Sequence, residues 1–476
     1  MTDKKTPYFF ALLPILILIS LLAYNVFLYG DNSLGGANQL ALLFAAAAAA
    51  IVGIKFGAKW KIILDGISNS ISSTTPSIII LLLIGALAGT WLLSGIVPAM
   101  IYYGLQILSP EIFLFASAII TAIVSLATGS SWSTIATIGI ALLGIGQALG
   151  LPTGLIGGAI ISGAYFGDKM SPLSDTTNLA PAMAGTDLFT HIRYMMYTTI
   201  PSFTLTLIIF LVIGFTYKTS GTQDINELLL AISNSFNISG WLFLVPVLII
   251  ALIIKKIPAI PALLAGTILG GIFAIIFQPE VILSVASASE LNISSAYMAV
   301  INAMGGDISI TTENEMINNL LSTSGMAGML NTIWLIICAM IFGGAMEATG
   351  LLKRVAEPII EYAESTGSLI ATTAATCIFF NITASDQYLS IVVPGRMYAD
   401  TYKDKGLAPE NLSRTLEDSG TVTSVLIPWN TCGATQSAVL GVATFAYLPF
   451  CFFNLISPLM TIAYGYFGIK IKKLTK

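Results

Sequence analysis

Long apolar segments separated by short polar ones run through almost the whole chain. The hydrocarbon core of a bilayer is crossed by about 20 mostly apolar helical residues, and windows of this kind recur with no long polar block between them. The pattern therefore predicts an all-helical membrane protein with about 10–12 transmembrane segments. The predicted segments lie at about 8–29, 38–58, 76–97, 111–127, 134–151, 196–217, 240–254, 258–278, 326–350, 366–380 and 440–468.

Four polar stretches interrupt this pattern, two in each half of the chain. Non-helical backbone at membrane depth survives only where it is buried in protein or lines a wet cavity, because lipid cannot satisfy its free N–H and C=O groups. The four breaks therefore predict one shared polar cavity. They are "SLATGSSWSTIATIG" (125–139), "GDKMSPLSDTTNLAP" (167–181), "FFNITASDQYLS" (379–390) and "TLEDSGTVTSVLIPWNTCGATQS" (415–437).

Small and hydroxyl residues also recur between the halves at a fixed offset of 255 residues. The predicted segments 76–97 and 326–350 run in opposite directions across the membrane. Together these features favour an inverted-topology repeat, 1–220 and 240–476, which is the usual construction of secondary transporters with a binding site at the midplane. The matching positions are Gly89, Ser94, Gly95, Thr128 and Ser130 with Gly344, Thr349, Gly350, Thr383 and Ser385.

The placement of charge predicts the orientation. Loops rich in lysine and arginine face the cytoplasm, whereas the connection 279–325 contains neither residue and is predicted to be an extracytoplasmic loop. This assignment places both termini in the cytoplasm. The basic segments carry Lys4, Lys5, Lys55, Lys59, Lys61, Arg193, Lys255, Lys256, Lys353, Arg354, Lys470, Lys472, Lys473 and Lys476.

Composition excludes most other classes of protein. The 476 residues are 56% hydrophobic and 9% charged, with a mean hydropathy of +0.88, so the whole chain reads as a single membrane transporter domain, 1–476. Basic patches with interleaved aromatics are absent, which excludes nucleic acid as a partner. An intramembrane enzyme is disfavoured because the sequence has no HExxH pair and one histidine. A channel is disfavoured because the ring or filter of a pore is repeated around an axis, whereas the repeat in this sequence is two-fold and inverted.

Candidate chemistry centres on two aspartates, Asp175 and Asp386, each flanked by hydroxyl or amide side chains. Ionisable residues inside a membrane are functional candidates by default, and Na⁺, a hard cation, prefers such oxygen ligands. The same carboxylates can take up a proton, so competition of Na⁺ and H⁺ for one group is the simplest coupling mechanism. The predicted cation- and proton-binding residues are Asp175, Thr176, Thr177, Asn178, Ser385 and Asp386, with Na⁺ itself held by Asp175, Asn178 and Asp386.

The remaining residues of the four breaks are predicted to line the substrate cavity. Half-helices that end there would direct backbone N–H groups at anions and carbonyl groups at cations. An organic anion is thus an alternative ligand for the same cavity. The predicted lining residues are Thr128, Gly129, Ser130, Ser131, Thr383, Gln387, Asp418, Ser419, Asn430 and Thr431.

Several polar residues have two interpretations. Asp168 and Lys169 are either a charge pair in a cytoplasmic loop or a structural or gating element of the cavity. Asp418 is either a cavity residue or the cap of a helix start in water. His191 is expected near the lipid headgroups and Glu347 at the membrane interface.

Three stretches resemble the signature regions of the NhaC-type sodium/proton antiporter family, within a wider ion-transporter superfamily. They are "GAYFGDKMSPLSDTTNLAP", "NITASDQYLSIVVPGRMY" and "LEDSGTVTSVLIPWNTCGA". The resemblance covers nearly the whole chain. It implies a multi-pass protein of the prokaryotic inner membrane that exchanges Na⁺ for H⁺ without a cofactor. The alternative, found in some members, is exchange of a small organic acid such as malate or lactate.

The resemblance also implies an architecture. Re-entrant hairpins would have their tips at 128–131 and 383–387, and broken helices would lie at 171–181 and 418–436. A mobile transport domain would move against a scaffold in an elevator-like motion, within a homodimer.

Overall fold

The structure is a computed structural model that describes residues 6–29, 33, 35–217, 225–310, 318, 321–361 and 364–474. Within these ranges, nine helical segments are long and apolar enough to cross a membrane, and eleven do so if each of two bent helix pairs forms one span. This agrees with the all-helical architecture of 10–12 segments. The nine are α1 (Tyr8–Tyr29), α2 (Ala37–Lys55), α3–α4 (Trp60–Ser73, Thr75–Leu93), α6 (Pro110–Thr128), α7–α8 (Ser131–Thr134, Ile140–Ala148), α11 (Leu188–Thr216), α14 (Ala259–Phe277), α18 (Leu330–Ala348) and α20 (Thr366–Thr383).

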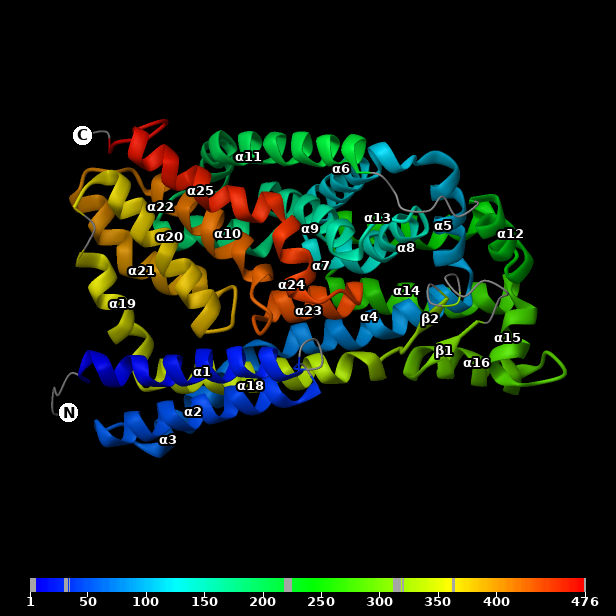
Figure 1. Cartoon of the computed structure of the whole chain (residues 1–476), viewed down its shortest axis with the longest axis horizontal. Helices are drawn as coiled ribbons and strands as arrows, with labels where there is room; N and C mark the ends of the chain where they lie inside the picture. The colour runs from blue at the N-terminus through cyan, green and yellow to red at the C-terminus, as the bar shows by residue number, and fades with distance from the viewer. Residues whose placement is uncertain are drawn as a thin grey trace.

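The two bent pairs and the shorter elements complete the bundle (Figure 1). One pair bends by 85° between α12 (Ile225–Ser235) and the helix that includes α13 (Leu244–Ile254), and the other by 55° between α24 (Thr444–Tyr447) and α25 (Phe452–Phe467). The other helices are α5 (Ile96–Ile107), α9 (Thr153–Met170), α10 (Asp175–Ala184), α15 (Pro279–Ala286), α16 (Ile293–Gly305), α19 (Leu351–Glu361), α21 (Leu389–Asp404), α22 (Pro409–Leu416) and α23 (Thr431–Leu440), beside a small antiparallel pair, β1 (Ile308–Ser309) and β2 (Ser322–Thr323).

All four predicted breaks are present. Gly129 ends α6 with a left-handed backbone (φ 70°), and Ser171 separates α9 from α10 in extended conformation. In the second half, α20 ends at Thr383 before α21, and α22 passes into a π-helical turn, Glu417–Thr421. Each of these four helices ends inside one of the polar stretches, as the sequence predicts.

The helix boundaries repeat with the offset found in the sequence. Helix α4 begins at Thr75 and α18 at Leu330, 255 residues later, and both contain 19 residues. Helix α5 begins at Ile96, and α19 begins at Leu351, which is again 255 residues later. The boundaries agree with a repeat of 255 residues, and the inverted orientation of its halves stays a prediction.

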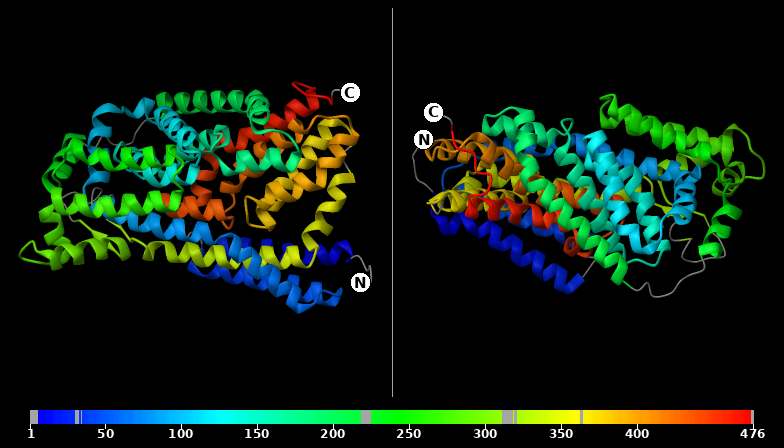
Figure 2. Two further views of the ribbon diagram at one scale, coloured as in Figure 1. Left: turned by 180° about the vertical axis from the view of Figure 1, so that it is seen from behind. Right: turned by 90° about the horizontal axis from the view of Figure 1, so that it is seen from above.

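The two ends of the molecule differ in content. Helix α1 begins and α25 ends at the same end of the long axis, whereas α12, α15 and α16 gather at the opposite end (Figures 1 and 2). The connection 279–325 is thus no plain loop, because α15, α16 and the β1–β2 pair lie in it. Residues 1–5 and 475–476 lie outside the described ranges, and which end faces the cytoplasm stays a prediction.

Close packing of small residues holds α9, which carries part of the site. A Cβ added to Gly163 would collide with the Ala118 carbonyl, and one added to Gly167 would collide with the Ala122 carbonyl, both on α6. Glycine allows the two backbones to approach in this way. The contact fixes the end of α9, and hence Asp168 and Lys169, against the helix that ends at Gly129.

Candidate functional site

A cavity of about 490 Å³ lies where the breaks meet. One set of lining residues comes from α3–α4 and from the connection between α13 and α14, which contributes Lys256. The other set comes from all four polar breaks, of which the fourth contributes Thr431 at the start of α23. Among the predicted residues, the lining contains Thr128, Gly129, Ser130, Asp175, Thr176, Asp386, Gln387 and Thr431, beside Asp168, Ser174 and Trp132.

Asp168 is anchored to the α6–α7 break. Its Oδ2 atom accepts hydrogen bonds from the Ser131 backbone N–H at 3.0 Å and from the Ser131 hydroxyl at 2.6 Å. The carboxyl is 9% exposed and borders the cavity. Such a carboxylate can hold a cation from one side while Ser131 fixes it from the other.

Asp175 and Thr176 stand in the first turn of α10. Ser174 caps this helix by accepting a hydrogen bond from the Thr177 N–H, and its hydroxyl lies 3.2 Å from that of Thr176. Asp175 is exposed to the cavity, where nearby carboxylate and hydroxyl oxygens suit a hard cation. The carboxylate also complements the N-terminal dipole of α10.

Asp386 enters the same cavity from the break between α20 and α21. The carboxyl is 6% exposed, and its Oδ1 atom accepts a hydrogen bond of 2.9 Å from the Leu389 N–H. The preceding residue, Ser385, has a left-handed backbone with φ 60°, which is strained for a residue other than glycine. Its carbonyl accepts a 3.0 Å hydrogen bond from the Thr431 N–H, so this strained turn is tied to the start of α23.

Other predicted residues support the breaks instead of lining the cavity. The Thr177 hydroxyl donates to the carbonyl groups of Asp168 and Lys169 at 3.3 and 3.0 Å. The Asn178 amide donates to the Pro172 and Ser174 carbonyls at 3.0 and 2.7 Å, on the exposed side of α10. The structure therefore brings Asp175 and Asp386 to one cavity but not Asn178. Also buried outside the lining are Ser131, Thr383, Ser385, Ser419 and Asn430, the last as the cap of α23.

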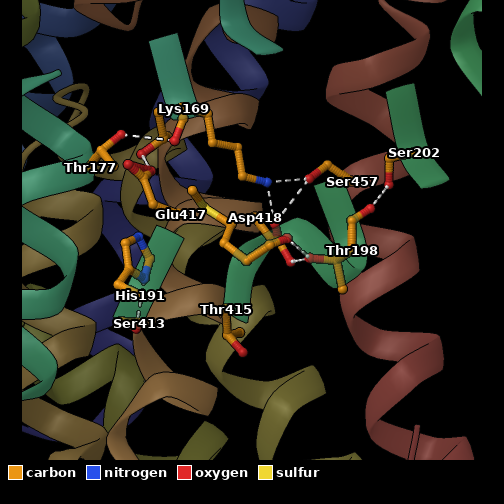
Figure 3. A network of polar contacts seen from close by, with 12 residues as sticks. Lys169, Thr177, His191, Thr198, Ser202, Ser413, Thr415, Glu417, Asp418 and Ser457 are labelled. Carbon is orange, nitrogen blue, oxygen red and sulfur yellow. Dashed lines mark hydrogen bonds and ion pairs between the residues drawn. The ribbon is translucent and has the colours of Figure 1, made fainter. Parts of the chain in front are cut away.

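The loop interpretation of Asp168 and Lys169 is wrong, as is the capping interpretation of Asp418. Lys169 is fully buried in the last turn of α9 and forms an ion pair with the equally buried Asp418 (Figure 3). The Lys169 ammonium also donates to the Ser457 hydroxyl at 3.0 Å, and the Thr198 hydroxyl donates to Asp418 Oδ2 at 2.8 Å. Asp418 is thus a member of a buried charge network and does not line the cavity.

His191 and Glu347 take different environments. His191 is fully buried, with its Nδ1 atom 2.8 Å from the Ser413 hydroxyl (Figure 3). A position among lipid headgroups is therefore wrong for this side chain. Glu347 is exposed and borders a second cavity of about 460 Å³ together with Asp65 and Asn69.

Within the described residues, no group of three or more His, Cys, Asp and Glu side chains is close enough to hold a metal ion.

Two features of the site escaped the sequence interpretation: the pairing of Lys169 with Asp418, and the position of Lys256. Asp168 lines the cavity, which agrees with the second of its two interpretations. The signal for a helical position of Asp168 and Lys169 was present, because the apolar residues before Asp168 continue the helix pattern up to Met170. Lys256 was assigned to a cytoplasmic loop, and the structure places it beside the cavity.

Comparison with known proteins bears on this arrangement. A family model described as "Na+/H+ antiporter family" matches residues 163–469, which include the breaks around Asp175, Asp386 and Asp418. The chain is also 37% identical to the Na(+)/H(+) antiporter NhaC of Alkalihalophilus pseudofirmus, over 99% of this chain and 98% of that protein. The chain belongs to the Na⁺/H⁺ antiporter family. The resemblance of the three signature stretches is thereby confirmed.

Other proteins to which this chain is similar carry different names. The malate-2H(+)/Na(+)-lactate antiporter of Bacillus subtilis is 38% identical over 98% of this chain and 96% of its own length. The arginine/ornithine antiporter ArcD of Halobacterium salinarum is 34% identical over 98% of this chain and 94% of its own length. The family consists of antiporters, so the chain is a membrane transporter and not an enzyme.

Proposed function

We propose that this protein exchanges Na⁺ for H⁺ by alternating access through the central cavity, with Asp175 and Asp386 as the cation-binding carboxylates. Support comes from the placement of these residues, which are 211 positions apart in sequence and line one cavity at two helix breaks. Thr176, Thr128, Ser130 and Thr431 add oxygen atoms to the same lining. Both ions are cargo, and the proposed transport needs no cofactor.

The two sets of lining residues suggest how access alternates. The set from α3–α4 and the α13–α14 connection contains no carboxylate, whereas the set from the breaks contains Asp168, Asp175 and Asp386. A rigid movement of the elements that carry the second set past those that carry the first would carry the ion, which is an elevator-like motion. We place the protein in the prokaryotic plasma membrane with both termini in the cytoplasm, and propose that it works as a homodimer.

A second candidate is coupled exchange of a small organic acid. One observation favours it: the cavity of about 490 Å³ exceeds what a bare Na⁺ needs and falls within the range of small-molecule sites. Lys256 on the lining could accompany a carboxylate, whereas Arg396, the other candidate cation, is exposed on α21 and lies outside the lining. The Bacillus subtilis relative named as a malate-2H(+)/Na(+)-lactate antiporter also supports this second candidate.

Everted vesicles with an imposed pH gradient test the leading function. Wild type should cause Na⁺-dependent dequenching of a pH-sensitive dye, and Asp175→Asn and Asp386→Asn should each reduce it by about tenfold or more, since each removes a charged ligand. Asp404→Asn, in the exposed last turn of α21, is the matched control and should retain full activity. Unchanged activity in both site variants would contradict the assignment of Asp175 and Asp386 as cation-binding residues. Addition of malate or lactate to the same vesicles distinguishes the second candidate.

A further inference from the structure

Glu417 is a buried carboxyl group that the cation site does not use. It begins the π-helical turn Glu417–Thr421 and has an exposed fraction of 0%. Its Oε2 atom accepts a hydrogen bond from the Thr421 hydroxyl, and its Oε1 atom receives no hydrogen bond from any described residue. An ionised carboxylate with an unsatisfied buried oxygen is costly, whereas a protonated one needs fewer donors.

The neighbouring Asp418 has the opposite environment. Its Oδ1 atom is paired with the Lys169 ammonium and its Oδ2 atom accepts a hydrogen bond from Thr198, so both of its oxygens are satisfied (Figure 3). Lys169 points towards Asp418 and Ser457, and its ammonium is thereby committed to that pair. Two adjacent carboxyl groups thus share one close ammonium, and Asp418 holds it.

The other charged and titratable groups near Glu417 do not supply a second ion pair. Asp168 on α9 acts on it with a like charge, Cys377 on α20 is a thiol, and Lys169 acts on it as the cation already paired with Asp418. Arg414, one turn earlier, lies over the Tyr194 ring at 4.6 Å and forms no ion pair with a carboxylate of the described residues. Among the described residues, no ion pair therefore balances an ionised Glu417 carboxylate.

Glu417 also lies near the cavity lining. The Thr176 side chain is a neighbour of the Glu417 carboxyl without a hydrogen bond to it, and its hydroxyl lies 3.2 Å from that of Ser174. Thr176 lines the cavity beside Asp175. A proton can pass between the Glu417 carboxyl and cavity water by way of this hydroxyl, which both donates and accepts. A rotation of this hydroxyl would link the buried carboxyl to the place where the cation binds.

We propose that Glu417 is the proton-binding residue of the exchange, separate from the cation site at Asp175 and Asp386. When Na⁺ enters the cavity, its charge favours release of the Glu417 proton through Thr176 to water. When the cation leaves, the carboxyl takes up a proton again. One positive charge replaces another in each half-reaction, and the Lys169–Asp418 pair holds the turn that carries Glu417 in place. This inference rests on the proposed cation site.

Two transport assays in proteoliposomes separate this role from a structural one. Na⁺/Na⁺ exchange, followed with ²²Na⁺, moves no net proton, whereas Na⁺/H⁺ antiport requires one. Glu417→Gln cannot release a proton, so its antiport should fall by at least about tenfold while its Na⁺/Na⁺ exchange stays within about twofold of wild type and loses its dependence on pH. Glu410→Gln is the control, because this carboxyl on the adjacent α22 is paired with the half-exposed Lys472 and should retain pH-linked antiport.

The outcomes that would overturn the inference are distinct. Antiport with an unchanged pH profile in Glu417→Gln overturns it. So does equal loss of both exchange modes in a variant that keeps the wild-type melting temperature. If Glu417→Gln does not fold, Glu417→Asp decides: a displaced pH profile supports the inference and an unchanged one overturns it. Failure of wild type to exchange Na⁺ in the same vesicles would instead contradict the proposed function.

Discussion

Ser131 holds Asp168 with two hydrogen bonds to a single oxygen, one from its backbone N–H at 3.0 Å and one from its hydroxyl at 2.6 Å. The two residues belong to different helix breaks, α6–α7 and α9–α10. The contact therefore connects the breaks and orients a carboxylate of the cavity lining at the same time.

Ser131→Ala removes the hydroxyl donor and leaves the backbone N–H. A hydrogen bond to a charged group contributes about 1.5–3 kcal/mol, and one of the two bonds remains, so the apparent KM for Na⁺ should rise about 3- to 10-fold. Ser117→Ala is the control, because this buried hydroxyl on α6 has no hydrogen-bond partner among the described residues. Initial rates of Na⁺-dependent dye dequenching give the KM, and an equal effect of both substitutions would contradict the role of Ser131.

Gly129→Ala tests the contact between the same two breaks through stability. Gly129 has φ 70°, and an added Cβ would lie 2.5 Å from the Leu173 Cβ atom, so the substitution adds a collision to a backbone strain of about 1–3 kcal/mol. Gly185→Ala has a similar backbone, φ 85°, with nothing within 4 Å of the new methyl group. The melting temperature in detergent should fall clearly further for Gly129→Ala, and equal losses would mean that the contact with Leu173 is unimportant.

The sequence was sufficient to predict the breaks because of a strong physical constraint. Lipid offers no hydrogen bonds, so a polar, glycine- and proline-containing stretch between apolar helices must face protein or water. This reasoning predicted the helix interruptions near Gly129, Ser171, Ser385 and Glu417. It also predicted one shared cavity, and the structure has Asp175 and Asp386 in the lining of one cavity.

The pairing of side chains could not be predicted in the same way. Asp168 and Lys169 are neighbours of opposite charge, which left two interpretations open, a pair in a loop or an element of the cavity. On a helix, however, successive side chains diverge by about 100°. Asp168 consequently faces the cavity, whereas Lys169 reaches Asp418, which is 249 residues further along the chain. Partners this distant leave no local pattern in a single sequence.

A double-mutant cycle measures the coupling between Lys169 and Asp418. Removing either partner leaves an unpaired buried charge and should destabilise the protein by about 3–5 kcal/mol. The double substitution Lys169→Met with Asp418→Leu removes both charges and should cost less than either single change. Thermal unfolding in detergent gives the comparison, and additive losses would show that the pair contributes no coupling. Loss of transport in a stable double variant would further indicate that the pair positions the functional carboxyl groups.

Lys256 supplies the last prediction, because it places a positive charge beside a cavity that is proposed to take up cations. The lining also contains Asp168, Asp175 and Asp386, and Lys256 has a left-handed backbone with φ 65° in the connection between α13 and α14. Lys256→Gln should lower the apparent KM for Na⁺ about 2- to 4-fold at low ionic strength, since one repulsive charge is removed from the approach of the ion. Added choline chloride should abolish the difference, because the Debye length shortens to about 10 Å at 0.1 M salt. Lys255→Gln, at an adjacent exposed position outside the lining, is the matched control.

The second candidate function predicts a different result for the same variant. If Lys256 contacts the carboxylate of an organic acid, Lys256→Gln would weaken exchange of that acid and raise its KM. The direction of the change in KM for each substrate therefore distinguishes repulsion of a cation from contact with a carboxylate.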